Sequence, residues 1–131
     1  MAAVLPLDVA QSFAHSYAVV DVETTGLSAE HDRVVQVAVA LMEPGGEVTH
    51  QWSSLIDPQR DPGPTHIHGI TADRLRGAPT YPQVRDTIHG LVQDRVVVAH
   101  NARFDWDFLA QEAQRSESKF PSTQRLCTYQ L

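Results

Sequence analysis

The chain has 131 residues, of which 42% are hydrophobic and 20% charged, and its formal net charge is −6. This length suffices for one domain with a hydrophobic core, and these fractions are typical of ordinary globular proteins. The acidic balance argues against a broad basic surface that would bind nucleic acid through many phosphate contacts, although bound metal ions can supply positive charge locally. The single cysteine, Cys127, excludes an internal disulfide, and no apolar stretch approaches the length of a membrane span, so we expect a cytoplasmic protein.

The first half of the chain is predicted to form three strands. Apolar, β-branched runs predict strands over residues 17–23 and 33–42. A turn signal at residues 44–46 precedes a third, partly alternating run over residues 48–56. The second and third strands should therefore form an antiparallel hairpin.

The second half adds helices and further strands. Thr71 is a candidate N-cap for a short helix, and apolar residues recur at helical spacing over residues 81–92. Residues 96–99 form a short apolar run typical of a buried strand, Asn101 is a candidate cap for another helix, and residues 122–131 resemble a strand that passes into a helix. This order predicts an α/β protein with a mixed sheet flanked by helices.

Two carboxylates end the first predicted strand. Asp21 and Glu23 are two residues apart, so strand alternation places both on one face, with Val20 and Val22 on the other. Two anions side by side at the end of a mostly buried strand repel each other unless a cation joins them. Oxygen ligands of this kind favour Mg²⁺ or Mn²⁺. The alternative interpretation is a solvated strand end with no ligand.

A third carboxylate is expected near the start of the helix that follows Asn101. Asp105 comes directly after Phe104 and four residues before Leu109, at the edge of the apolar stripe of that helix. Asp107 lies roughly 200° further round the helix and should face solvent. An acidic residue in a first helical turn is also stabilised by the helix dipole, by about 0.3–1 kcal/mol, and this effect can coexist with metal binding.

The three carboxylates together predict a two-metal site. Asp21, Glu23 and Asp105 come from a strand end and a helix start that are separated by a long crossover. Such a site can hold two ions roughly 3.5–4 Å apart, the arrangement used for in-line attack at phosphorus.

Three segments of the chain resemble motifs of the DEDD exonucleases. Residues 20–27, Val-Asp-Val-Glu-Thr-Thr-Gly-Leu, resemble the first motif of the DnaQ-like, DEDDh-type branch, which includes domains similar to the epsilon subunit of DNA polymerase III. Residues 67–71, Ile-His-Gly-Ile-Thr, resemble the segment between the first two motifs. Residues 100–105, His-Asn-Ala-Arg-Phe-Asp, resemble the second motif. The resemblance implies a ribonuclease H-like fold and 3′→5′ hydrolysis of nucleic acid that releases nucleoside monophosphates.

The resemblance also implies roles for individual residues. Asp21, Glu23 and Asp105 match the catalytic metal ligands of the family, for Mg²⁺ or Mn²⁺. The backbone of residues 24–27 would bond the terminal hydroxyl of the substrate, and Leu27 would wedge against a base. The implied pocket for the 3′-terminal nucleotide comprises Thr24, Thr25, Gly26, Leu27, His68, Asn101 and Phe104.

The third motif of the family has no counterpart in this sequence. That motif is a histidine followed five residues later by the fourth acidic ligand, whereas here the last histidine is His100 and no Asp or Glu follows Glu117. We therefore expect an N-terminal segment over residues 1–15 and an exonuclease domain over residues 16–131 that lacks its C-terminal helices. One face of the sheet should be partly uncovered, metal binding should be weak, and turnover should be slow or absent.

The leading functional interpretation is a DNA exonuclease domain that acts on single-stranded 3′ ends in proofreading, replication or repair, with a DNA polymerase subunit as a candidate partner. An RNA-trimming enzyme is an alternative, because discrimination rests on contacts to the 2′ position that the sequence does not reveal. A catalytically dead fragment that acts as a polymerase-binding module is another. Metal binding without cleavage of an oligonucleotide would indicate truncation, and the loss of both would indicate a scaffold.

Overall fold

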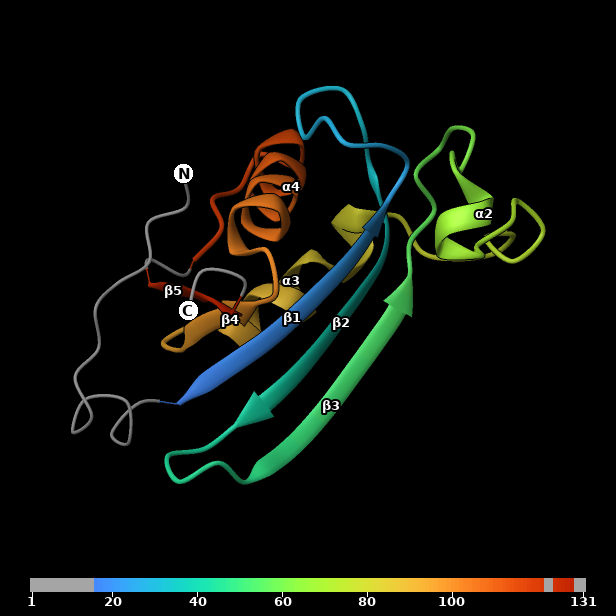
Figure 1. The fold of residues 1–131 in the computed structure, drawn as a ribbon. Helices are drawn as coiled ribbons and strands as arrows, with labels where there is room; N and C mark the ends of the chain where they lie inside the picture. Colours follow the sequence, from blue (N-terminus) through green and yellow to red (C-terminus); the bar gives the residue numbers. More distant parts are fainter. Residues whose placement is uncertain (1–15, 122–123, 129–131) are drawn as a thin grey trace.

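A computed structural model describes residues 16–121 and 124–128. The N-terminal segment predicted over residues 1–15 and parts of the predicted segment over residues 122–131 lie outside the described residues. The described strands form one mixed sheet in the order β3-β2-β1-β4-β5, with helices packed against it (Figure 1). The predicted α/β class is confirmed.

The first three strands form an antiparallel unit at one side of the sheet. They are β1 (Tyr17–Thr24), β2 (Val34–Met42) and β3 (Val48–Leu55). The register of β1 against β2 shifts between Glu23 and Thr24, at the end of β1 that carries the predicted site. The predicted strands and the predicted hairpin are therefore confirmed, with boundaries that differ by a residue.

The other side of the sheet is parallel. β4 (Val96–Ala99) pairs with β1, and β5 (Arg125–Cys127) pairs with β4. The last pair between β1 and β4 joins Val19 to Val98, so the second half of β1 extends beyond the end of β4. This leaves one edge of β1 accessible to other elements at the level of Asp21 and Glu23.

Two long helices follow the predicted pattern. α3 (Tyr81–Val92) begins with a capping box, in which the Thr80 backbone N–H donates to Gln83 Oε1 at 2.9 Å. α4 (Ala102–Arg115) follows β4 after two residues, and its N-cap is Asn101 as predicted. The Asn101 side chain, however, makes no capping hydrogen bond.

The short helix predicted after Thr71 is wrong. The Arg74 backbone N–H does donate to Thr71 Oγ1 at 3.3 Å, but residues 72–77 form successive turns. Gly77, with a φ of +81°, and Pro79 follow too soon for a helix to continue. A single helical turn, α2 (Thr65–His68), forms earlier instead, between Pro64 and a left-handed Gly69.

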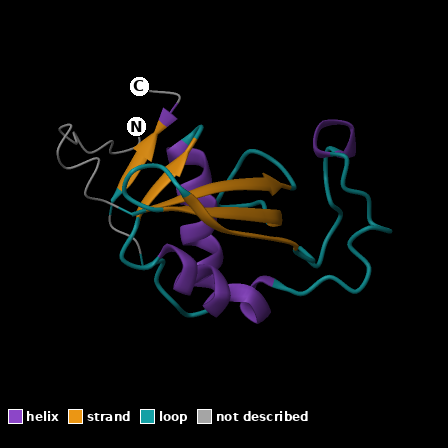
Figure 2. Cartoon of the chain, turned by 90° about the horizontal axis from the view of Figure 1, so that it is seen from below, coloured by secondary structure: helices purple, strands orange, loops and turns teal. Residues whose placement is uncertain are grey.

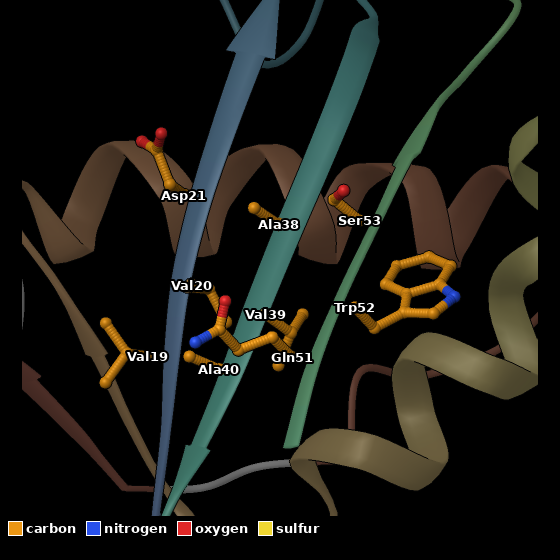
Figure 3. A pocket seen from close by; sticks show the side chains of 9 residues that line it. All are labelled: Val19, Val20, Asp21, Ala38, Val39, Ala40, Gln51, Trp52 and Ser53. Atoms are coloured by element: carbon orange, nitrogen blue, oxygen red, sulfur yellow. The ribbon is translucent and has the colours of Figure 1, made fainter. Parts of the chain in front are cut away.

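The largest cluster of buried hydrophobic residues lies on one face of the sheet. α3 lies behind β1 and β2 in Figure 1, and helices pack against the sheet in the turned view of Figure 2; residues of both α3 and α4 belong to this core. On β1, Val20 and Val22 point into this core with exposed fractions of 3% and 5%, whereas Val19, on the other face, is 38% exposed. That other face forms an open groove over the first three strands, lined by Val19, Asp21, Ala38, Ala40, Gln51 and Ser53 among others (Figure 3).

Candidate active site

The strand β1 places the first two predicted carboxylates on the open face of the sheet. Its side chains alternate in burial, with Val20, Val22 and Thr24 buried while Asp21 is exposed and Glu23 is half-buried. In Figure 3 the Asp21 carboxylate projects from β1 beside the groove. The predicted common face of Asp21 and Glu23 therefore follows from the regular pleat of this strand.

Asp105 reaches β1 from the first turn of α4. Its side chain is only 5% exposed, and its carboxylate accepts a hydrogen bond from the Val22 backbone N–H. This contact is possible because β1 continues beyond its last pair with β4. The edge of β1 thus supplies a donor to a helical carboxylate at the level where Asp21 and Glu23 lie.

The electrostatics show that the three carboxylates influence one another. Burial, together with the negative charges of Asp21 and Glu23, raises the pKa of Asp105 to about 7, although the hydrogen bond from Val22 opposes this shift. Burial also raises the pKa of Glu23, with a contribution from Asp21, whereas a protonated His68 would lower it. The fold therefore brings the predicted residues into one negatively charged environment.

The donor set fits a hard divalent cation, although no ligand cage is preformed. Within residues 16–121 and 124–128, no group of three or more His, Cys, Asp or Glu side chains is arranged closely enough to hold an ion. The carboxylate that is costly to ionise, Asp105, would be stabilised in its charged form by a cation near Asp21 and Glu23. Carboxylate oxygens are the ligands that Mg²⁺ and Mn²⁺ prefer.

The four residues that follow Glu23, residues 24–27, differ greatly in exposure. Thr24 and Thr25 are buried, with exposed fractions of 8% and 9%, whereas Leu27 is 88% exposed. The Thr24 hydroxyl donates to the carbonyl oxygen of Gly26, which closes a tight turn. Burying Leu27 against a base would remove a large apolar side chain from water, as its predicted role requires.

The loop over residues 25–33 is closed by a ring of hydrogen bonds around Asp32. The Thr25 backbone N–H donates to the Arg33 carbonyl at 2.8 Å, and the Arg33 N–H donates to Thr25 Oγ1 at 3.0 Å. The Asp32 carboxylate accepts from the Thr25 hydroxyl at 3.0 Å and from the Ser28 N–H at 3.1 Å. A Cβ at Gly26 would lie 2.4 Å from Asp32 Oδ2, so a larger residue here would displace the Asp32 carboxylate from these hydrogen bonds.

His68 is held by the loop that carries it. Its Nδ1 accepts from the Ile70 backbone N–H at 2.9 Å, which leaves Nε2 to donate to the Pro62 carbonyl at 2.9 Å. These bonds assign the neutral Nε2–H tautomer. Both ring nitrogens therefore have backbone partners, and the predicted contact of His68 with a nucleotide requires its ring face or an exchange of one of these bonds.

The other two predicted pocket residues lie at the start of α4. Asn101 is exposed, and Phe104 is half-buried with its ring centroid 4.8 Å from that of Phe108. Asp107, one turn from Arg103, forms an exposed ion pair with it at 3.8 Å. The Asp105 residue is 5% exposed and the Asp107 side chain 49%, which confirms the predicted difference in exposure between the two.

Two residues of this region were not predicted from the sequence. Gly63 has a φ of +82°, and a Cβ there would lie 2.1 Å from the Thr25 carbonyl oxygen, so it packs directly against the loop after β1. The Pro-Gly-Pro sequence around it is the signal that could have indicated a special turn. Glu112 is 1% exposed on α4, and its position seven residues after Asp105 could have marked it as a second buried acid.

The comparisons with known proteins identify the family. The model of the RNase_T family, described as "Exonuclease", matches residues 18–131, and the chain belongs to this family. This confirms the resemblance to the DEDD exonucleases. No helix of the described residues is long and apolar enough to cross a membrane.

Two curated relatives are DNA polymerases. The DNA polymerase III PolC-type of Halalkalibacterium halodurans is 40% identical over 95 residues, which are 71% of this chain and 7% of that protein. The protein of the same name from Bacillus subtilis is 41% identical over 96 residues, which are 72% of this chain and 7% of that protein. The chain therefore corresponds to a small part of these relatives.

The solved structures show the fold. A crystal structure of E. coli Exonuclease I in complex with a dT13 oligonucleotide superposes with a TM-score of 0.77 and 21% sequence identity. The match covers 86% of this chain and 28% of that one. The ribonuclease H-like exonuclease fold expected from the sequence is thus confirmed.

Proposed function

We propose that this chain is a metal-dependent 3′→5′ exonuclease domain that hydrolyses phosphodiester bonds at single-stranded 3′ ends of DNA and releases nucleoside monophosphates. The observation that carries the proposal is the buried Asp105, whose pKa is about 7 beside Asp21 and Glu23, in a chain of the exonuclease family. A buried acid beside two other acids is unfavourable for stability alone, and such sites are enriched in catalytic function.

Separate groups of residues would bind the metal and position the nucleotide. Asp21, Glu23 and Asp105 would hold Mg²⁺ or Mn²⁺, which when bound lowers the pKa of a water molecule and stabilises the leaving oxygen. Asp105 would release its proton when a cation binds, because its pKa in the metal-free protein is about 7. The backbone of residues 24–27 would position the terminal nucleotide, and Leu27 would pack against its base.

The relatives support DNA as the substrate. The PolC-type relatives are named as DNA polymerases, and Exonuclease I has been crystallised with DNA oligonucleotides. Proofreading or repair, with a DNA polymerase as partner, is the role that these similarities favour. Matched oligonucleotides that differ only in a DNA or RNA 3′ end would distinguish this proposal from an RNA-trimming enzyme, because the two differ at the 2′ position.

The rate of this chain by itself should be low. No histidine follows His100 in these 131 residues, so the histidine base of the third family motif has no counterpart here. General bases typically contribute about 10²–10⁴-fold to the rate. We propose that a version of the chain with a His-X4-Asp segment on a following helix is faster than the 131-residue chain by a factor of this order.

The proposal is tested by metal binding and cleavage measured together. Calorimetric titration with Mn²⁺ and degradation of a 3′-labelled DNA oligonucleotide are compared for the wild type, Asp21→Ala and Asp105→Asn, with Asp107→Asn as the matched surface control. We expect the first two variants to lose Mn²⁺ binding and any cleavage, and the control to keep both. Metal-dependent turnover that survives Asp21→Ala would refute the proposal. A wild type that neither binds Mn²⁺ nor cleaves would instead indicate a binding module.

A further inference from the structure

Glu112 is a buried acid on α4 that the proposed chemistry does not use. Its side chain is 1% exposed, and its Oε2 accepts the Val34 backbone N–H at 2.9 Å. The guanidinium of Arg33 binds the same carboxylate, with Nε 2.9 Å and Nη2 2.8 Å from Oε1. A buried carboxylate is tolerated only when it is paired and hydrogen-bonded. Here these partners belong to the start of β2, where the loop over residues 25–33 ends.

The side chain of Arg115, one turn further along α4, binds backbone carbonyl groups of the same loop. Its guanidinium donates to the carbonyl oxygens of Ala29 at 3.0 Å, Glu30 at 2.9 Å and Asp32 at 3.2 Å. Arg115 also lies 3.6 Å from the Glu112 carboxylate, which orients it. Because the three carbonyl groups bind one guanidinium that belongs to α4, they are fixed relative to this helix as well as relative to each other.

Arg33 connects Glu112 and Arg115 to the predicted nucleotide pocket. The side chain of Arg33 binds Glu112, while its backbone exchanges hydrogen bonds with the N–H and the hydroxyl of Thr25. Thr25 is one of the buried residues of the turn that precedes the exposed Leu27. The position of this turn relative to α4 is therefore set by two sets of bonds. Arg33 binds Glu112 on α4, and the backbone of Arg33 binds Thr25.

The two buried acids of α4 accept hydrogen bonds from neighbouring strands. Asp105 and Glu112 are seven residues apart, close to two helical turns, and so they lie on the same face of the helix. Asp105 accepts the N–H of Val22 on β1, and Glu112 accepts the N–H of Val34 on β2. The same helix face thus holds a predicted metal ligand and the anchor of the predicted nucleotide pocket.

We propose that Glu112, together with Arg33 and Arg115, positions the loop over residues 25–33 so that its first turn can receive the 3′-terminal nucleotide. In this proposal the three residues contact neither substrate nor metal and act through Thr25 and the loop carbonyls. This inference rests on the proposed exonuclease function for its ligand. Its effect on the loop itself is independent of that function.

The test replaces Glu112 with glutamine. The Glu112→Gln variant keeps the volume and an acceptor for the Val34 N–H but removes the charge that binds both arginines. Glu117→Gln, at an exposed position just beyond the end of the same helix, is the matched control. Three quantities are measured: amide hydrogen exchange along the chain, the affinity for Mn²⁺, and the affinity for thymidine monophosphate in the presence of Mn²⁺.

We expect Glu112→Gln to accelerate exchange at residues 25–33 and to weaken thymidine monophosphate binding, each by about 10-fold, because hydrogen bonds to a charged group are lost. The Mn²⁺ affinity should stay within about twofold of the wild type, since the three metal-binding carboxylates are unchanged. The control should change none of the three. Loop-specific exchange combined with this split between nucleotide and metal affinity separates positioning from a general loss of stability.

Two results would overturn the inference: acceleration spread equally over α3, β1 and the loop, or a loosened loop with unchanged nucleotide affinity. If the wild type binds neither Mn²⁺ nor the nucleotide, the proposed function fails, and with it the claim that the loop is held for a nucleotide. The exchange data would then still decide whether Glu112 fixes the loop.

Discussion

Replacing Asp105 with asparagine should stabilise the metal-free protein while it removes metal binding. In the folded chain the pKa of Asp105 is about 7, compared with an ordinary value of 3.8, because burial and the charges of Asp21 and Glu23 disfavour its ionised form. Asparagine has the same shape, carries no charge and can still accept the Val22 N–H. The gain in stability therefore equals the free energy spent on ionising Asp105 inside the fold.

The magnitude and its pH dependence follow from the two pKa values. Because the folded pKa lies above the unfolded one, the folded state binds more protons between about pH 4 and 7, and the wild type loses stability as the pH rises through this window. The loss reaches about 4 kcal/mol at pH 8 and stays below about 1 kcal/mol at pH 4. This figure is an upper limit, because structural relaxation and the titration of Glu23 reduce it.

Urea unfolding in the presence of a chelator measures this effect directly. The free energies of unfolding of the wild type, Asp105→Asn and the control Asp107→Asn are compared at pH 4, 6 and 8. The advantage of Asp105→Asn should grow with pH, whereas the exposed Asp107, paired with Arg103 at 3.8 Å, should show a difference within about 1 kcal/mol at each pH. An advantage that is the same at pH 4 and pH 8, or a destabilised Asp105→Asn at pH 8, would contradict the electrostatic picture of the site.

The remaining predictions concern the loops and the metal. Gly63→Ala should destabilise the protein by about 1–3 kcal/mol more than Gly45→Ala. Both glycines have positive φ, but only a Cβ at Gly63 would meet the Thr25 carbonyl oxygen, at 2.1 Å. Thermal unfolding of both variants measures this difference. Leu27→Ala should change the free energy of unfolding by no more than about 0.5 kcal/mol but weaken the binding of a single-stranded oligonucleotide in a fluorescence titration, whereas Val48→Ala, which is also exposed, should alter neither. Mn²⁺ at 100 times its dissociation constant should stabilise the wild type by about 2.7 kcal/mol in the same unfolding assay, and a chelator should reverse this; equal stability with and without Mn²⁺ would show that the folded chain has no specific site.

Local patterns were sufficient to predict most of the elements. The alternation along β1 predicted that Asp21 and Glu23 share a face, because side-chain direction in a strand depends only on position along the strand. The helical spacing of apolar residues predicted α3 in the same way, and its boundaries agree with the pattern. The helix expected after Thr71 failed because a cap starts a helix only if enough residues follow before Gly77 and Pro79.

The amino-acid sequence by itself predicted which acids form the proposed site and on which elements they lie. Only the tertiary structure decided how α4 packs against the strands. Arg33, for example, pairs with Glu112 across 79 positions of the chain. The tertiary structure likewise decided that Asp105 accepts the Val22 N–H and that the ring nitrogens of His68 bind backbone groups. The physical reason is that periodicity encodes direction within one element, whereas the partner of a buried charge depends on how separate elements pack.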